Sequence, residues 1–391
     1  MRHTPAVQRL RQAPWDSLRP EVALPAIARA LQGAAAEREV DRALRSHPEL
    51  DRDQRTAAVE AIFGVALWRR RLRWEIGAEG TAAQLLGSLL RDLAGLPEER
   101  ALALAGLPAL PRRYEPPRRL ADRWSLPDWL EAHLLAELGE EAEPFCAAVS
   151  VPGPVCLRAN RLLCTREQLA RRLDAEGIAT RPAGRAPDAL LVTSARPNLF
   201  GTLAWRQGFF EVQDEGSQLL GLLVDPRPGE TVLDLCAGAG GKSLLLAARG
   251  ARVLAHDPDG ERLERLRARA RRARATAVEV IEAPQAADRV LVDAPCSELG
   301  TLRRGPDSRW RIDPASLARL PALQSLLLDQ AASLARKRVV YGTCTLSRAE
   351  NEEVAARFDR EHPRMRRTLT WRTTPHLEGT DGFFAAVWDR A

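Results

Sequence analysis

The sequence predicts an α/β fold: a Rossmann-like domain with a doubly wound sheet, preceded by an all-α N-terminal domain. From about residue 210, short apolar runs alternate with helical stretches, which is typical of βαβ units and a parallel sheet. Two of these runs, Arg289–Asp293 and Arg338–Tyr341, each end shortly before a cysteine. Residues 22–104 instead repeat apolar side chains at helical spacing, which predicts helices.

Composition narrows the class of protein. The 391 residues suffice for two or three domains, and the formal charge of +6 favours an anionic partner. Six cysteines without a CxxC pair, and few scattered histidines, predict no metal site. No signal peptide opens the chain and no apolar run reaches membrane-spanning length. We therefore expect a cytoplasmic protein with reduced thiols and no membrane association. We also expect a monomer.

The N-terminal helices include Val22–Leu31 and Ala57–Leu67. Next come four arginines flanked by two tryptophans, in the order Trp68, Arg69, Arg70, Arg71, Arg73 and Trp74. A solvated helix face is the first interpretation. An RNA-contacting face is the alternative, because arginine beside an aromatic ring can bind phosphate and stack on bases.

A proline- and arginine-rich stretch, residues 108–119, ends the helical region because proline interrupts helices. A short helix at Leu126–Leu138 follows. The strand Val155–Asn160, the helix Arg166–Glu176 with Thr165 as its N-cap, and the strand Leu190–Thr193 then predict a small α+β unit. We expect four parts: a helical domain at 1–110, a linker with a short helical segment at 111–145, an α+β subdomain at 146–208 and the sheet domain at 209–391.

The sheet domain can be predicted element by element, because apolar runs of strand length alternate with segments of helical periodicity. In order, the expected elements are the strand Thr231–Cys236, helix Lys242–Arg249, strand Arg252–His256, helix Gly260–Ala273, strand Ala277–Ile281, strand Arg289–Asp293, helix Ala315–Ala335, strand Arg338–Tyr341, helix Arg348–Arg360 and strand Phe383–Trp388.

A glycine-rich turn, Gly238–Gly241, follows the first of these strands and opens a helix. The second strand leads to Asp257, 23 positions after Asp234, close to where such folds place an acid that binds ribose hydroxyls. The turn lacks both the full dinucleotide spacing and a Walker motif, so S-adenosylmethionine is the better candidate ligand. The alternative for Asp257 is a cap on the next helix.

Two cysteines follow strands of this domain. Cys296 lies in Asp293-Ala-Pro-Cys-Ser297, and Cys344 lies in Tyr341-Gly-Thr-Cys-Thr345. The carboxyl ends of parallel strands meet at one edge of the sheet, where such folds place their chemistry. The alternative is a pair of buried small apolar residues. Two thiols near a carboxylate and a cofactor loop predict covalent catalysis.

These segments together resemble the RNA 5-methylcytosine methyltransferases of the Nop2/Sun group. The matching motifs are Leu233–Lys242, Asp293–Ser297 and Tyr341–Thr345, supported by Val212–Gln218, Arg303-Arg304, Pro306-Asp307, Asn351-Glu352 and Gly379–Phe384. The helical region, with Asp51-Arg52 and Phe63-Gly-Val65, is similar to a NusB-type RNA-binding domain.

The resemblance implies a role for each motif residue. Cys344 would add to C6 of cytosine, Asp293 would hydrogen-bond N3 and supply a proton, and Cys296 would act when the enzyme is eliminated. Lys242 would reach the base and help to lower a thiol pKa. Trp310 or a nearby arginine would fill the gap that a flipped base leaves. Cofactor contacts would fall on Cys236, Ala237, Gly238, Ala239, Gly240, Gly241, Lys242, Asp257 and Asp293, with Glu282, or alternatively Asp288, on the adenine.

The expected substrate is RNA, with 16S ribosomal RNA favoured over transfer RNA by analogy with the N-terminal match. A DNA cytosine methyltransferase would use Cys296 as its nucleophile and need a recognition insert. The 48 positions between the cysteines leave no room for one. A non-catalytic RNA-binding assembly factor is the other alternative, and the intact set of Lys242, Asp293, Cys296 and Cys344 argues against it.

Overall fold

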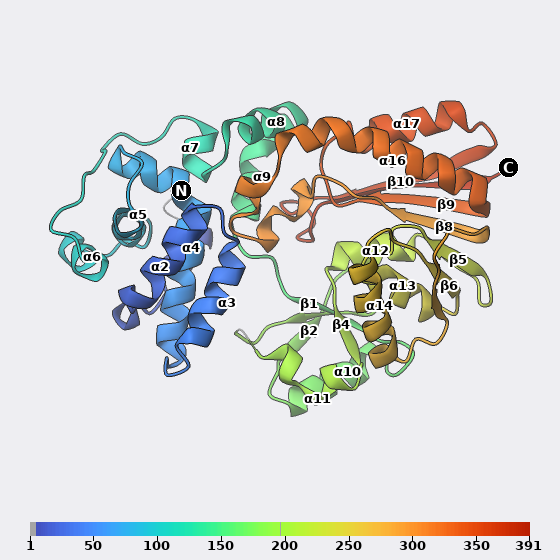
Figure 1. The fold of residues 1–391 in the computed structure, drawn as a ribbon, viewed down its shortest axis with the longest axis horizontal. Coiled ribbons are helices and arrows are strands. Elements are labelled where there is room, and N and C mark those ends of the chain that lie inside the picture. The colour runs from blue at the N-terminus through green and yellow to red at the C-terminus, as the bar shows by residue number, and fades with distance from the viewer. Residues whose placement is uncertain (1–4, 196) are drawn as a thin grey trace. The chain divides into compact units, whose positions relative to one another are not determined.

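The computed structural model describes residues 5–195 and 197–391 (Figure 1). Two compact units form: residues 1–152 with 302–313, and residues 153–301 with 314–391. The expected linker at 111–145 groups with the helical unit, and the small α+β segment groups with the large sheet.

The first unit is helical. Its longest helix, α4, begins with a capping box between Asp51 and Gln54 and ends at Gly77, whose left-handed φ of 67° suits a residue without a side chain. Its helices are α1 (Pro5–Arg11), α2 (Pro20–Leu31), α3 (Ala36–Ser46), α4 (Arg52–Ile76), α5 (Ala82–Ser88), α6 (Glu98–Ala105), α7 (Leu120–Trp124), α8 (Asp128–Leu138) and α9 (Ala142–Val149).

A segment from the second half of the sequence, Leu302–Asp313, belongs to the helical unit rather than to the sheet domain. It contains the short helix α15 (Ser308–Arg311), and its Arg309 is fully buried and donates to the carbonyls of Trp124 and Val149. Asp307 accepts a hydrogen bond from the amide of Ala36. This insertion departs from the expectation that residues 209–391 form one domain. It was not predictable because its contacts are nonlocal.

A small antiparallel sheet opens the second unit, in the order β2-β3-β1-β4. Its elements are β1 (Cys156–Ala159), α10 (Arg166–Ala175), β2 (Thr180–Pro182), β3 (Ala189–Val192), α11 (Leu203–Arg206) and β4 (Phe210–Val212). Thr165 caps α10 through a capping box with Gln168, as its sequence position predicts. The strands β2 and β4 have three residues each and were not predicted.

The large sheet has seven strands in the order β10-β11-β9-β8-β5-β6-β7. The five strands from β9 to β7 are parallel, whereas β11 and β10 add antiparallel neighbours at one end. The elements are α12 (Glu215–Leu222), β5 (Thr231–Asp234), α13 (Gly241–Ala247), β6 (Arg252–Ala255), α14 (Gly260–Ala273), β7 (Val278–Val280), β8 (Ala287–Asp293), α16 (Pro314–Leu334), β9 (Ala335–Thr343), α17 (Glu352–Glu361), β10 (Met365–Thr373) and β11 (Phe383–Arg390).

Helices cover both faces of this sheet, as a doubly wound fold requires (Figure 1). Alternation along β9 shows the two sides: Val339 and Tyr341 pack with α16 and α17, and Val340 packs with α12 and α13. The carboxyl ends of β5, β6, β8 and β9 therefore lie along one edge, supported on both faces.

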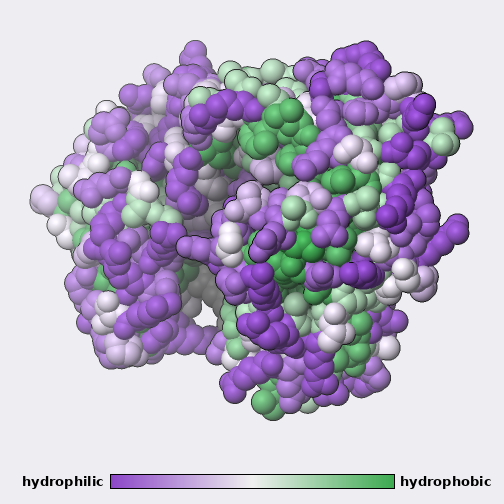
Figure 2. Space-filling view, turned by 45° about the vertical axis from the view of Figure 1, so that its right-hand side comes forward, coloured by the Kyte–Doolittle hydropathy of each residue, from purple (hydrophilic) through white to green (hydrophobic). Residues whose placement is uncertain are grey.

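The surface is mostly hydrophilic on the face that Figure 2 shows, with smaller hydrophobic patches between the polar side chains. No helix within residues 5–195 and 197–391 is long and apolar enough to cross a membrane. The same residues contain no cluster of three or more His, Cys, Asp or Glu side chains arranged to hold a metal ion.

Candidate active site

The two cysteines singled out by their motifs meet at the carboxyl edge of the sheet. Cys296 follows β8 and Cys344 follows β9, and their Sγ atoms lie 3.3 Å apart. The backbone amide of Cys344 donates to Cys296 Sγ, also at 3.3 Å. The loops are further joined by a hydrogen bond from the Gly300 amide to the Cys344 carbonyl. Because β8 and β9 are adjacent parallel strands, the fold itself places these thiols together.

Gly300 must be a glycine for this approach. A Cβ atom there would lie 2.2 Å from the Gly382 carbonyl oxygen and 2.8 Å from that of Cys344, and neither backbone group can move aside easily. The loop after Cys296 thus packs directly on the backbone of its neighbours.

The pKa of the Cys344 thiol is raised well above its ordinary value. The hydrogen bond with Cys296 is the largest cause, followed by burial and by the negative charges of Glu298 and Asp293. The expected lowering of a thiol pKa by Lys242 is therefore not found at Cys344. Its resting state is a neutral thiol, which must lose its proton before or during attack.

Lys242 pairs instead with Asp293, whose Oδ2 lies 2.5 Å from Nζ. Lys242 is buried near the start of α13, and Asp293 is the last residue of β8. The ammonium also lies 5.9 Å from the centre of the Phe383 ring. Lys242 and Asp293 are 51 positions apart in the sequence, and the fold brings them together. Asp293 lies three positions before Cys296.

The glycine-rich loop between β5 and α13 is held from outside by two arginines. Arg158 of β1 donates to the Gly241 carbonyl at 2.6 Å, and Arg269 of α14 donates to the Ala239 carbonyl at 2.8 Å. Glu211 of β4 binds Arg269. The two arginines thus hydrogen-bond carbonyl groups of the loop and hold its backbone in place. Sequence reasoning missed Arg158, because nothing near it in the chain marks it as a partner of the loop.

Gly240 is required by the turn itself. Its φ is +85°, and a Cβ there would lie 2.6 Å from the Leu266 side chain. The glycine lets the loop pack closely on α14 before the chain enters α13.

Asp257 is buried beside this loop and is not the cap of α14. Its Oδ2 accepts from the Gly238 amide at 2.8 Å and its Oδ1 from the Asp259 amide at 2.9 Å. Asp259 is the residue that caps α14. The capping alternative for Asp257 is therefore wrong, and Asp257 remains a candidate for a ligand next to Gly238.

Asp234, at the end of β5, is a site residue that the sequence reading missed. It is 1% exposed, its Oδ2 accepts from the Ser243 hydroxyl at 2.6 Å, and its Oδ1 is buried with no hydrogen-bond partner among the described residues. Burial raises the pKa of Asp234 to about 7 despite the Ser243 hydrogen bond, and the nearby Asp293 adds to the rise. An unsatisfied buried oxygen beside the loop indicates a place for a ligand donor.

The raised pKa of Asp234 predicts a pH effect on stability. The folded protein holds a proton there that the unfolded chain loses above about pH 4, so the free energy of unfolding falls as pH rises toward about 7. The Asp234→Asn variant does not titrate at this position. Relative to wild type, its free energy of unfolding should gain about 3 kcal/mol between pH 5 and pH 8. Urea unfolding at both values tests this, and parallel pH profiles would contradict it.

The remaining predicted cofactor residues lie at the carboxyl edge of the sheet, with the exception of Asp288. Cys236 and Ala237 begin the loop, burial raises the pKa of the Cys236 thiol, and the Ala237 amide donates to the His256 carbonyl. Glu282 is exposed just beyond β7, at the carboxyl edge. Asp288 lies near the amino end of β8, where it accepts from the Thr231 amide and pairs with Lys337. The Asp288 alternative for the adenine contact is therefore wrong, because it lies at the opposite edge of the sheet.

The arginine-rich face of α4 is largely engaged within its own unit. Arg70 binds Asp122 and Asp128, and Arg71 binds Glu75. The Arg69 guanidinium lies 3.9 Å from the centre of the Trp310 ring, covering one face of the side chain expected to fill the gap of a flipped base. These contacts show that the face is not simply solvated, and RNA contact by it stays a prediction.

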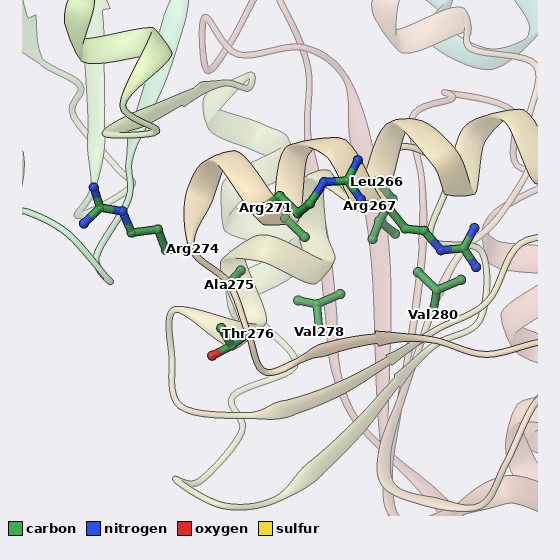
Figure 3. Close-up of a pocket in the computed structure, with 9 residues that line it drawn as sticks. Leu266, Arg267, Arg271, Arg274, Ala275, Thr276, Val278 and Val280 are labelled. Atoms are coloured by element: carbon green, nitrogen blue, oxygen red, sulfur yellow. The ribbon is translucent and has the colours of Figure 1, made fainter.

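A groove of about 560 Å³ lies away from the thiols, between α14 and the edge strand β7 (Figure 3). Its floor is apolar, with Leu266, Val278 and Val280, and arginines rim it. Figure 3 shows Arg274 pointing away from the groove. Because β5 and β6 separate β7 from β8, the groove is not part of the thiol site.

Comparison with known proteins gives consistent matches. A family model described as "16S rRNA methyltransferase RsmB/F" matches residues 221–388, and a model of the ferredoxin-like domain of RsmF/B-like methyltransferases matches residues 126–198.

Curated relatives match over much of their length. The probable ribosomal RNA small subunit methyltransferase B of Bacillus subtilis (strain 168) is 34% identical, over 73% of this chain and 71% of the relative. The protein of that name in Synechocystis sp. (strain ATCC 27184 / PCC 6803 / Kazusa) is 30% identical, over 89% of this chain and 93% of the relative.

Solved structures share the fold. The crystal structure of PH0851 superposes with a TM-score of 0.80 at 23% identity, covering 95% of this chain and 99% of that one. NSun6 from Pyrococcus horikoshii, solved with SFG, gives 0.61 at 19% identity and covers 68% of this chain and 98% of that one. At these identities the likeness supports the Rossmann-like architecture alone.

Proposed function

The chain belongs to the RsmB/F family of ribosomal RNA methyltransferases, and we propose that it methylates C5 of a cytosine in 16S ribosomal RNA through a covalent thiol adduct. The observation that carries the proposal is the pair of thiols 3.3 Å apart. One of them, Cys296, lies three positions beyond Asp293, whose carboxylate pairs with the buried Lys242. Cytosine C5 is a poor nucleophile, and addition of a thiolate to C6 activates it.

The residues at the carboxyl edge fit S-adenosylmethionine as the methyl donor. The cofactor supplies an electrophilic methyl group when it is bound. Asp234 Oδ1, buried without a partner, suits an ammonium donor, and Asp257 suits ribose hydroxyls beside Gly238. The other residues proposed for the site are the loop Cys236–Lys242, Glu282 and Asp293.

In the proposed reaction, Cys344 Sγ forms a bond to C6 of the base. Asp293 Oδ2 is held by Lys242, which leaves Oδ1 to hydrogen-bond the polar edge of cytosine, and the pair can pass a proton to N3. C5, made nucleophilic by this addition, would accept the methyl group that the bound cofactor supplies, with cleavage of the cofactor's sulfur–methyl bond and release of the thioether. The C5 proton then leaves, the C6–S bond breaks, and Cys296 assists this elimination. The net change exchanges one C5 hydrogen for methyl and releases one proton.

The substrate is tested by incubating the protein with methyl-labelled S-adenosylmethionine and either small-subunit ribosomal RNA or transfer RNA. We expect label in the ribosomal RNA. Label in transfer RNA alone would contradict the 16S assignment and keep the chemistry. Absence of both transfer and cofactor binding would favour a non-catalytic assembly factor, the alternative that the sequence leaves open.

Arg158 should matter for the cofactor although it lies in the small sheet. The Arg158→Met variant keeps an apolar stem but frees the Gly241 carbonyl. We expect S-adenosylmethionine to bind roughly 10- to 100-fold more weakly, the range for loss of a hydrogen bond to a charged group. Calorimetric titration measures this. Arg171→Met, on the exposed side of α10, is the matched control, and equal affinities for the two variants would contradict the role.

A further inference from the structure

A buried glutamate that belongs to neither cysteine motif joins the two thiol loops. Glu350 is 0% exposed and lies just before α17. It is six residues beyond Cys344, and no cationic side chain forms an ion pair with it among the described residues. A carboxyl group taken out of water in this way must be held by hydrogen-bond donors.

Both of its oxygens accept hydrogen bonds from the loop that carries Cys296. Ser297 donates from its amide to Oε2 at 3.0 Å and from its hydroxyl to Oε1 at 2.5 Å. Gln324 of α16 donates to Oε2 at 3.0 Å and also to the Pro295 carbonyl at 2.9 Å. The residues on either side of Cys296 are thereby fixed to Glu350, one directly and one through Gln324.

The same carboxyl group is tied to the loop that carries Cys344. The Thr345 hydroxyl lies 3.5 Å from Oε1 and 2.7 Å from the Ser297 hydroxyl. Ser297 has one hydroxyl hydrogen, which goes to Glu350, so Thr345 donates to Ser297. Tyr341 of β9 donates to the backbone carbonyl of Glu350 at 2.5 Å, which anchors the residue to the strand before Cys344.

We propose that Glu350 is a positioning residue that clamps the Cys296 and Cys344 loops together and so sets the separation of the two sulfurs. The inference rests on the proposed two-thiol function. Glu350 does not touch the reacting atoms; it acts through Ser297, Gln324 and Thr345.

The chemistry of the clamp requires a carboxyl group. Each neighbour presents an N–H or O–H, so an acceptor is needed at both oxygens. An amide in the same place either directs its NH₂ at the Ser297 and Gln324 N–H groups and loses that side of the clamp, or directs it at the Ser297 hydroxyl, which must then accept and reverse its hydrogen bond with Thr345. The Glu350→Gln variant therefore changes two or three hydrogen bonds while nearly preserving side-chain volume.

Loosening the clamp should affect one step more than the others. Cys344 also stays attached to β9 and to Gly300, so adduct formation can continue. Cys296 relies on Ser297 and Pro295 for its place, and its proposed step is elimination of the enzyme from C6. We therefore expect the protein–RNA adduct to accumulate relative to methylated product, a shift in ratio that a general loss of folded protein does not produce.

The test measures turnover, methylated RNA and denaturation-resistant protein–RNA adduct in wild type, Glu350→Gln and Glu353→Gln. Glu353 is exposed in the first turn of α17, which makes it the matched control. We expect Glu350→Gln to lower turnover about tenfold or more and raise the adduct-to-product ratio, with Glu353→Gln like wild type.

If circular dichroism shows that Glu350→Gln is unfolded, the Ser297→Ala variant provides the test instead. It removes the hydroxyl between Glu350 and Thr345 and should also raise the adduct-to-product ratio. If the wild type is active and the folded Glu350→Gln variant has an unchanged adduct-to-product ratio, the role of Glu350 is overturned, while the proposed two-thiol function stands. A wild type that transfers no methyl group and forms no adduct with any RNA overturns the proposed function, and the clamp with it.

Discussion

Replacing Cys344 with alanine is expected to abolish methyl transfer and adduct formation together, because the variant lacks the sulfur that is proposed to bond to C6. The loss should be roughly 10⁴-fold or more, as is found when an enzyme nucleophile is removed. Cofactor affinity should not change, since Asp234 ends β5, the loop follows β5, and Asp257 follows β6, all apart from the Cys344 loop after β9. Methyl-labelled S-adenosylmethionine measures transfer, and denaturing gels measure the adduct.

Cys164→Ala is the control for this experiment, because Cys164 is a buried thiol of the small α+β region, at the turn between β1 and α10. Transfer near the wild-type rate in Cys344→Ala would show that Cys344 is not the nucleophile. Loss of activity in both variants would indicate a general sensitivity to thiol removal.

Replacing Cys296 with alanine is expected to have the opposite effect on the adduct. Cys344 remains able to attack C6, but elimination loses its assisting group, so the enzyme should stay bound to RNA. Turnover should fall by about 10² to 10⁴, the range for an acid–base group, while the adduct becomes abundant. The double variant Cys296→Ala/Cys344→Ala should form none. An adduct in Cys344→Ala and none in Cys296→Ala would exchange the two roles, as in a DNA-type mechanism.

Much of the sheet domain could be predicted because its elements are local patterns. The helix Gly260–Ala273 matches α14 at both ends, and the predicted parallel strands fall on β5 to β9 within a few residues. The strand β10 was missed because its residues are mostly polar or exposed, so it shows no clear apolar alternation. It forms at the edge of the sheet because β11 offers it a partner.

The helix expected at Arg348–Arg360 begins instead at Glu352. The cause is tertiary: Asn351 binds Thr343 and Thr345, and Glu350 binds Ser297, so these side chains turn back toward the thiol loops. Such a preference for distant partners cannot be read from helical periodicity.

Site residues that belong to a strand-end motif could be predicted from the sequence. Site residues whose partners are distant in the sequence could not. Lys242, Asp293, Cys296 and Cys344 each follow or end a strand, and the sheet order brings their strands together. Arg158 and Glu350 carry no local signal, since their partners lie 83 and 53 positions away. Asp234 looked like part of a buried strand, and only its unpartnered oxygen marks it as a site residue.

The thiol-adduct mechanism can be tested most simply by asking whether methylation removes the hydrogen at cytosine C5. Small-subunit ribosomal RNA carrying tritium at C5 of its cytosines is incubated with the protein and S-adenosylmethionine, and released tritium is compared with methyl groups transferred. The thiol-adduct mechanism predicts one tritium released per methyl group, with 5-methylcytosine as the product. Methyl transfer without tritium release would place the new group on another atom and contradict the thiol-adduct mechanism.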